Sequence, residues 1–326
     1  MIILNLMGGL GNQLFEYAYA RALAEEFGDK MIIINPYFSK FYNITAQRTF
    51  RMTPNLLVDL KLNSNVQEIA CGRGVLYGGY DFLKFAFERI FTSRYFSPEK
   101  YIKRSSKGNF QIGDFGISYF AHSTTAPTNK IVTGLYQSEK YFSEIREILL
   151  QEFQVKSEPS KENAQMMDEI SSCNSIGVHI RKGDYDAPQW SYLNVCDEGY
   201  YHRALKYINE HVSNPVFYIF SNTHSDIEWI KRSYYFDQPV KYVDLNNSGV
   251  EDLRLMYSCK HFAISNSTLS WWGSYLSKNP NKIVCAPSKW FARTPGRLNA
   301  KPYPGRMDIY RDDMIKIPVR LGEEQT

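Results

Sequence analysis

The segment VHIRKGDYDAP places several chemically active side chains directly after an apolar run. It contains an imidazole at His179, two cations at Arg181 and Lys182, and two carboxylates at Asp184 and Asp186. The preceding residues SIGV predict a buried strand, so these groups would lie at the carboxyl end of that strand. Because ligands bind at that edge of an open α/β sheet, the segment predicts a ligand site.

The Arg181 guanidinium indicates phosphate chemistry. Its planar donor fork matches phosphate oxygens, and it stays charged at any relevant pH, which is what a departing diphosphate needs. A surface ion pair between Arg181 and Asp184 is the simpler alternative. The DYD sequence also resembles the DxD pattern of metal-dependent sugar transferases, but a match this short is weakly specific.

A second candidate site lies where KHFAIS, a predicted strand, passes into STLSWWGSYLS, a predicted helix. Ser265, Asn266, Ser267 and Thr268 stand at this junction. Hydroxyl and amide side chains can cap a helix there, and the free N–H groups with the helix dipole attract an anion. An ordinary N-cap is the alternative interpretation.

Asp252 belongs to the preceding predicted helix, within reach of the same sheet edge. A carboxylate can accept hydrogen bonds from the N1–H and amino group of guanine, adjacent donors that uracil lacks. His179 could contact the other side of the base. Taken alone, each residue fits an ordinary surface or helix-cap role better.

The amino-terminal sequence GGLGNQLF forms a glycine-rich turn. A dinucleotide fingerprint starting at Gly9 requires Gly or Ala where Leu14 stands, and the next predicted strand ends in Asn35 rather than an acidic residue. Both departures disfavour an NAD-linked oxidoreductase. What remains is a loop whose backbone can approach a ligand and a helix N-terminus suited to phosphate, or a plain strand-to-helix turn.

Strand-like and helix-like segments alternate along the chain. MIILNLM, a helix over residues 13–27 and MIIIN form a βαβ opening, and KIVTGLYQ begins a further strand–helix pair. Later strands are expected at 175–180, 215–222, 239–245, 260–265 and 282–287, with helices at 200–212, 225–235, 249–258 and 267–277. This rhythm predicts an α/β protein with parallel sheets. The polar segment 154–164, with its proline, is expected to be a linker between domains.

Composition limits the class of protein. A chain of 326 residues exceeds what one hydrophobic core of roughly 250–300 residues usually supports, so two domains are expected. A net charge of +4 is too weak for nucleic-acid binding but permits a local anion site. The odd count of 5 cysteines without CxxC spacing indicates reduced thiols. Without a signal-peptide pattern or a transmembrane run, we expect a cytoplasmic protein, with contact to the cytoplasmic membrane face left open.

Together, GGLGNQLFEYAYARA, HIRKGDY, FYIFSN and KHFAISNSTLSWWGSYLS resemble glycosyltransferase family 11, the α-1,2-fucosyltransferases, in order and spacing. The resemblance spans nearly the whole chain. It implies a GT-B architecture of two facing Rossmann-like domains, an acceptor-side domain at 1–155 and a GDP-fucose-binding domain at 156–326. It also implies transfer with inversion, no metal or other cofactor, and the 2-hydroxyl of a terminal galactose in an oligosaccharide or lipid-linked glycan as acceptor.

The resemblance assigns donor-binding roles to individual positions. His179 and Arg181 match the histidine and first arginine of the family's HxRRxDY motif, whereas Lys182 replaces the second arginine. In related fucosyltransferases the matching histidine binds guanine and the matching arginine binds phosphate. A point charge stands where the family has a planar fork, which leaves the role of Lys182 open. Asn222 also departs from the family, because many members carry an aspartate there.

Five further positions take roles from the same resemblance. It implies that Asp252 binds guanine, that Ser267 and Thr268 bind phosphate, and that Gly11 and Asn12 form a phosphate-facing loop. The aromatic residues available for an acceptor-binding face are equally suited to packing the first domain; they are Tyr37, Phe38, Tyr42, Tyr77 and Tyr80.

The expected reaction is a direct displacement at fucose C1 by the acceptor hydroxyl. Asp184 and Asp186 are candidates for the general base, although Asp184 could instead orient Arg181, and a highly dissociative transition state needs no strong base. A transferase of another linkage or another GDP-sugar is the first alternative. A noncatalytic protein that binds a GDP-sugar is the alternative from a different class.

Overall fold

The chain forms two compact units, described here from a computed structural model. The structure describes residues 1–6, 8–35, 55–70, 110–112, 130–186, 188–292 and 308–319. The first unit comprises Met1–Gln154 and Gly296–Arg311, and the second comprises Val155–Pro295 and Asp312–Thr326. The five aromatic residues considered for an acceptor face and Cys71 lie outside the described residues.

The first unit is built on a parallel sheet with the strand order β3-β2-β1-β5-β4. The strands are β1 (Ile2–Asn5), β2 (Met31–Asn35), β3 (Gln67–Ala70), β4 (Phe110–Ile112) and β5 (Lys130–Thr133). The helices are α1 (Leu10–Phe27), α5 (Arg146–Glu152) and the short 3-10 helices Glu139–Tyr141 and Ser143–Ile145. Helix α1 is buried along most of its length because it packs against β1, β2 and β5.

The second unit has a parallel sheet with the strand order β11-β10-β9-β6-β7-β8. The strands are β6 (Asn174–His179), β7 (Pro215–Phe220), β8 (Val240–Tyr242), β9 (His261–Ala263), β10 (Val284–Pro287) and β11 (Met314–Ile317). Strands β6 and β7 are buried almost throughout, which explains their nearly continuous apolar sequences.

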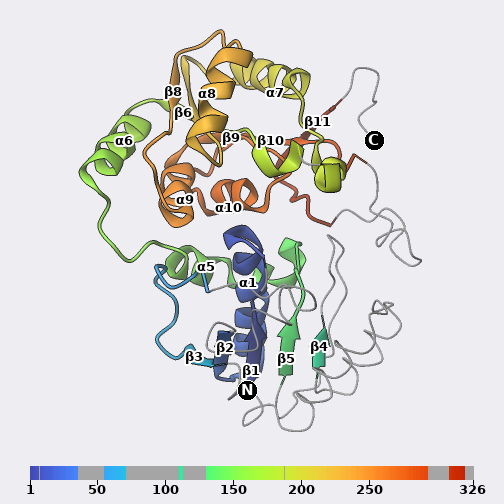
Figure 1. The fold of residues 1–326 in the computed structure, drawn as a ribbon. Coiled ribbons are helices and arrows are strands. Elements are labelled where there is room, and N and C mark those ends of the chain that lie inside the picture. Colours follow the sequence, from blue (N-terminus) through green and yellow to red (C-terminus); the bar gives the residue numbers. More distant parts are fainter. Residues whose placement is uncertain are drawn as a thin grey trace. The chain divides into compact units, whose positions relative to one another are not determined.

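Helices cover both faces of this sheet (Figure 1). They are α6 (Lys161–Ser172), α7 (Glu198–His211), α8 (His224–Ser233), α9 (Gly249–Ser258) and α10 (Thr268–Leu276), with 3-10 helices at Gly183–Asp186 and Pro188–Leu193. Helices α7 and α8 lie on one face, whereas α9 and α10 lie side by side on the other, where α6 also packs against α9. The core between sheet and α7 is formed by side chains such as Ile176, Val178, Tyr200, Ile208 and Ile219.

The predicted α/β class is confirmed, as are the two Rossmann-like units that a GT-B architecture contains. Among the α-helices and strands of the described residues, four had no counterpart in the sequence analysis: α6, β3, β4 and β11. Helix α6 begins at Lys161, inside the segment expected to be a linker, because the Ser160 hydroxyl caps the N–H of Asn163 at 3.2 Å. Cys173, Cys196, Cys259 and Cys285 are free thiols, as predicted.

The unit boundaries differ from the predicted ranges at the C-terminal end. The break between Gln154 and Val155 lies close to the predicted boundary, but Gly296–Arg311 groups with the first unit. Within this segment Ile309 is buried, and Asp308 forms an ion pair with Lys140 at 2.6 Å. No helix within the described residues is both long enough and apolar enough to cross a bilayer.

Candidate active site

The strand order of the second unit creates a switch point between β6 and β9. From β6 the chain proceeds through β7 to β8 on one side, and the later strands β9, β10 and β11 extend the sheet on the other. All neighbouring strands are parallel, so their carboxyl ends share one edge. Ligands of open α/β sheets bind in the crevice at such a point.

His179 and Ser265 meet across this switch point. His179 is the last residue of β6, and Ser265 follows β9 by two residues. The Nδ1 atom of His179 and the hydroxyl of Ser265 are 2.7 Å apart, and both side chains are buried. Burial, reinforced by the charge of Arg181, lowers the pKa of His179 to about 3, so the ring is neutral at physiological pH.

Two adjacent tyrosines of α7 hold the strand ends on either side of the switch point. The Tyr201 hydroxyl donates to the carbonyl of His179 at 2.9 Å, and the Tyr200 hydroxyl donates to the carbonyl of Ile264 at 2.5 Å. Both tyrosines are fully buried. Their hydrogen bonds fix the backbone from which His179 and Ser265 project.

Arg181 and Lys182 follow β6 but make different contacts. Arg181 donates through Nη1 to the Asn222 side-chain oxygen, and its guanidinium lies 5.1 Å from the centre of the Tyr185 ring. The Lys182 ammonium lies 4.0 Å from the centre of the Trp229 ring of α8, within cation–π range. The two cations are therefore held by different neighbours.

The turn after these cations depends on Gly183. Its φ of +67° lies in the left-handed region, where a side chain would be strained, and Asp226 of α8 packs beside it. The 3-10 helix Gly183–Asp186 begins there. The structure describes the backbone of Asp184 and Asp186 but not their side chains, so their role as candidate bases stays a prediction.

The helix expected after Ser265 is α10, and the side chain at its N-cap position does not cap it. Ser267 occupies the N-cap position, yet its side chain makes no capping hydrogen bond, and Thr268 is only partly buried. Ser267 therefore does not satisfy the amides of α10, contrary to the ordinary capping role considered above. The Asn266 amide donates to the carbonyls of Leu193 and Trp290 at 2.8 and 2.9 Å and so fixes the preceding loop.

Asp252 lies in the first turn of α9. Within the described residues, its side chain forms no hydrogen bond with the other predicted donor-site residues. Burial is the main cause that raises the pKa of its carboxyl, from 3.8 to about 6. A hydrogen bond from Asn247 opposes this rise, and the nearby charge of Glu251 adds to it. A partly protonated carboxyl at neutral pH is unusual and often marks a functional position.

Gly11 and Asn12 belong to the first unit, and they correct one expectation. They were expected in a loop, but α1 already begins at Leu10, because the carbonyl of Gly9 accepts from the N–H groups of Asn12 and Gln13 at 3.0 and 3.1 Å. The Asn12 side chain accepts from the Gln137 amide at 2.9 Å. Both positions are thus in the first helical turn, and their phosphate role stays a prediction.

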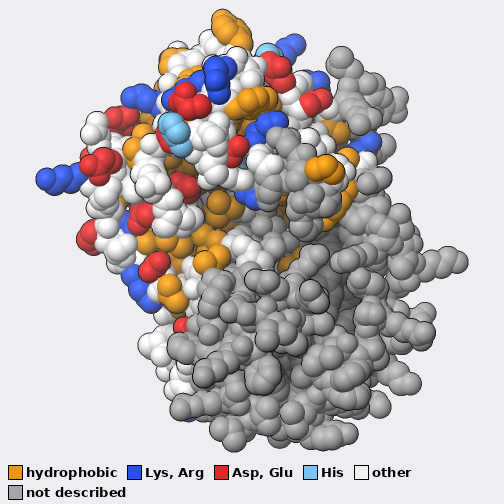
Figure 2. Space-filling model, in the orientation of Figure 1, with side chains coloured by type: hydrophobic (Ala, Val, Ile, Leu, Met, Phe, Trp, Pro, Cys, Tyr) orange, Lys and Arg blue, Asp and Glu red, His pale blue; other side chains and the backbone are white. Residues whose placement is uncertain are grey.

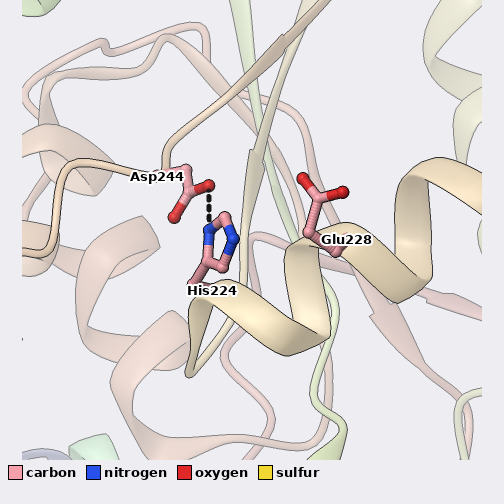
Figure 3. A group of neighbouring side chains, drawn as sticks. All are labelled: His224, Glu228 and Asp244. Carbon is pink, nitrogen blue, oxygen red and sulfur yellow. Dashed lines mark hydrogen bonds and ion pairs between the residues drawn. The ribbon is translucent and has the colours of Figure 1, made fainter.

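The described surface of the second unit also carries charged residues away from the proposed donor site. On the face drawn in Figure 2, acidic and basic side chains are intermingled over the described surface. His224, Glu228 and Asp244 bring potential metal-ligand atoms within 4.8 Å of one another (Figure 3). His224 already bonds Asp244 at 2.6 Å, and Glu228 bonds Lys231 at 2.6 Å. These pairs account for the group without an ion, and the expectation of metal independence stays a prediction.

Sequence reasoning missed the residues that position the site. Tyr200, Tyr201 and Trp229 were assigned only to helices, and the role of Asn222 was left open. Their contacts join segments up to 85 residues apart, as between the Tyr200 hydroxyl and the carbonyl of Cys285. The apolar-polar pattern of α7 signals that the tyrosines are buried, but it does not identify the carbonyls that they reach.

Comparisons with known proteins agree with this arrangement. The family described as "Glycosyl transferase family 11" matches residues 1–295. The chain is 31% identical to the O-antigen biosynthesis glycosyltransferase WbnK of Escherichia coli, covering 88% of this chain and 94% of that protein.

Two further relatives carry sugar names. An α-1,2-colitosyltransferase of Escherichia coli is 29% identical over 90% of this chain and 93% of its own length. Galactoside alpha-(1,2)-fucosyltransferase 2 of Oryctolagus cuniculus is 25% identical over 85% of this chain and 67% of its own. With a family match over most of its length and a glycosyltransferase relative above 30% identity, the chain is a glycosyltransferase and belongs to glycosyltransferase family 11.

Proposed function

We propose that the protein transfers L-fucose from GDP-fucose to the 2-hydroxyl of a terminal galactose, with inversion at the anomeric carbon. The observation that carries this proposal is the grouping of a neutral His179, the Arg181 guanidinium and the N-terminus of α10, which its N-cap side chain leaves uncapped, around one switch point. A neutral imidazole suits a nucleobase, and the cation with the helix N-terminus suits a diphosphate. The galactoside fucosyltransferase relative supports the donor and acceptor.

In the proposed reaction the acceptor oxygen attacks fucose C1 from the face opposite GDP. The bond between C1 and the diphosphate oxygen breaks, and its electron pair stays on the diphosphate. Arg181, Ser267 and Thr268 would stabilise that developing charge, with Lys182 as a further contributor. Preorganised donors of this kind are each worth about 3–4 kcal/mol.

The acceptor hydroxyl also loses a proton during the transfer. Asp184 and Asp186 are the candidates to receive it, because both follow the phosphate-facing turn in the chain. At the other end of the donor, His179 and Asp252 would bind guanine. Gly11 and Asn12 of the first unit would contact the diphosphate, as the resemblance implies.

The acceptor is proposed to be a lipid-linked precursor of a surface glycan at the cytoplasmic face of the membrane. The name of the O-antigen biosynthesis relative supports a surface polysaccharide. Free oligosaccharides that end in galactose would serve as soluble probes of the same specificity.

A second donor is favoured by the colitosyltransferase relative. Colitose is L-fucose without its 3-hydroxyl, so the two donors differ by one polar group. A site that hydrogen-bonds this hydroxyl would reject the deoxy sugar strongly, whereas a site that leaves it unbound would accept both. The choice between the donors is thus a choice about one hydrogen bond.

The proposal is tested with purified protein, GDP-fucose and a panel of galactose-terminated oligosaccharides in excess chelator. Mass spectrometry and NMR identify the product linkage, and we expect an α-1,2-fucosylated galactoside. The GDP-linked 3-deoxy sugar is assayed in parallel. Faster transfer of the deoxy sugar would replace fucose with colitose in the proposal, and binding of GDP-fucose without product from any acceptor would favour a noncatalytic role. Activity that requires added metal would overturn metal independence.

A further inference from the structure

The contact between Ser265 and His179 bears on which ring nitrogen of His179 carries the proton. The two groups are 2.7 Å apart, Ser265 is fully buried, and His179 is 2% exposed. Within the described part of the chain, this is the one recorded hydrogen bond of either side chain. The backbone on both sides is held by Tyr200 and Tyr201, so the pair is rigidly placed.

The direction of this hydrogen bond follows from the inventory of donors. A serine hydroxyl has one proton to donate, and a neutral imidazole has one donor nitrogen and one acceptor nitrogen. If Nδ1 donated to Ser265, the hydroxyl proton would be buried with no recorded acceptor. Buried donors are nearly always satisfied. The arrangement that satisfies the buried hydroxyl has Ser265 donating to Nδ1. Burial lowers the pKa of His179 and keeps the ring neutral, so its single proton is then on Nε2, where a ligand can accept it.

We propose that Ser265 is a positioning residue whose hydroxyl holds the proton of His179 on Nε2 and thereby presents that nitrogen to the ligand as a hydrogen-bond donor. The identity of the ligand rests on the proposed function, in which it is a guanine nucleotide. Guanine offers two adjacent acceptors, O6 and N7, whereas adenine has an amino donor in place of O6. A donor fixed on Nε2 would favour guanine over adenine.

The proton position is measured first on the unliganded full chain by nitrogen-15 NMR of the histidine ring nitrogens. The signals of His179 are identified by their loss in His179→Asn. We expect a protonated Nε2 and an unprotonated Nδ1 throughout pH 5–8. A proton on Nδ1 would overturn the inference. Because this experiment needs no ligand, a failure of GDP to bind would count against the proposed function alone.

Variants then separate positioning from simple packing. Ser265→Ala should yield a mixture of tautomers, weaken GDP binding about five- to tenfold, and narrow the preference for GDP over ADP. Ser265→Thr keeps the hydroxyl and should retain the wild-type ring signals. Ser277→Ala is the matched control, because it removes another buried hydroxyl, which bonds the carbonyl of Cys259 at 2.8 Å at the far end of α10.

The outcomes distinguish the two explanations for the contact. If Ser265→Ala left both the His179 signals and the ratio of GDP to ADP affinity unchanged, Ser265 would have no positioning role. If Ser265→Ala does not fold, the wild-type spectrum still decides the proton position. Ser265→Ala could also lose affinity equally for GDP and for ADP, and Ser277→Ala could show the same loss. That result would indicate an effect of packing and contradict the proposal.

Discussion

At the scale of single residues, the neighbouring cations Arg181 and Lys182 contact different side chains. Arg181 donates to the side-chain oxygen of Asn222, which is neutral and does not offset the charge of the guanidinium. An aspartate at that position would neutralise it in part. Lys182 instead lies against the Trp229 ring. We therefore expect Arg181 to contribute more to diphosphate binding than Lys182 does.

Arg181→Lys should reduce kcat/KM by about 100- to 1,000-fold while leaving the fold intact, because a lysine keeps the charge but loses the planar donor fork. Steady-state kinetics with GDP-fucose measure the loss, and circular dichroism checks the fold. Arg203→Lys is the matched control, since Arg203 donates to the carbonyl of Pro318 at 2.9 Å, outside the proposed donor site. Near-normal turnover of Arg181→Lys would refute the assignment.

Asp252 should make donor binding dependent on pH. The rise of its pKa from 3.8 to about 6 makes its ionisation about 3 kcal/mol less favourable than that of the same carboxyl in water, and only the ionised form can accept both guanine donors fully. Affinity for GDP-fucose should therefore fall as the pH decreases from 7 to 5. His179 stays neutral over this range, so it does not contribute to the pH dependence of the affinity.

Calorimetric titration at several pH values measures this effect. GDP-fucose is the appropriate ligand, because its diphosphate lacks the terminal phosphate ionisation near pH 6 that GDP has. Asp252→Asn should weaken binding at pH 7 and flatten the profile. An unchanged slope in this variant would place the titrating group elsewhere. The variant should also be more stable than the wild type at pH 7, since it removes the cost of a buried charge.

At the scale of elements, α10 depends on a close approach to α9. A Cβ on Gly273 would lie 2.5 Å from Cγ and 3.1 Å from Cβ of Met256, so the inner part of that side chain leaves no room. Both residues are interior to their helices. The approach packs α10 closely against α9.

Gly273→Ala should lower the free energy of unfolding by about 1–3 kcal/mol from overpacking, even though alanine favours a helix over glycine by up to about 1 kcal/mol. Urea denaturation measures the change. Met256→Ala makes room at the contact, so the double variant should lose less stability than the sum of the single variants. Strict additivity would show that the two residues do not compete for space.

At the scale of the whole molecule, each of the two parallel sheets has a polar side-chain contact at its switch point. In the first, the Gln137 amide donates to Asn12 beside the switch point between β1 and β5, and in the second, Ser265 meets His179 between β6 and β9. Each unit therefore has a polar contact where its strand order reverses. This repetition fits a protein that binds polar ligands at both sheet edges.

GDP at a hundred times its dissociation constant should stabilise the folded protein by about 2.7 kcal/mol. Thermal unfolding followed by calorimetry should show a rise in Tm, and UDP at equal concentration should give a smaller one, because uracil lacks the adjacent donors that Asp252 would bind. Hydrogen exchange should slow most at residues 179–182 and 265–268. Equal shifts with GDP and UDP would show that the base is not recognised.

The sequence by itself determined the α/β class, the parallel sheets and the positions of the HIRKGDY and NSTLSWW segments at strand ends. Hydrophobic periodicity and turn residues involve residues that are close together in the sequence, so these patterns can be recognised in a single sequence. Helix α6 was missed because it buries few apolar residues and lies in a polar segment.

Only the tertiary structure decided which strand ends are neighbours. Periodicity identifies a strand but not its partners, and the order that places β9 beside β6 comes from packing between distant segments. It joins Ser265 to His179 across 86 residues and directs Tyr200 and Tyr201 to the carbonyls at the two strand ends. The same packing buries His179 and Asp252 and so shifts their pKa values in opposite directions, because burial opposes charge of either sign.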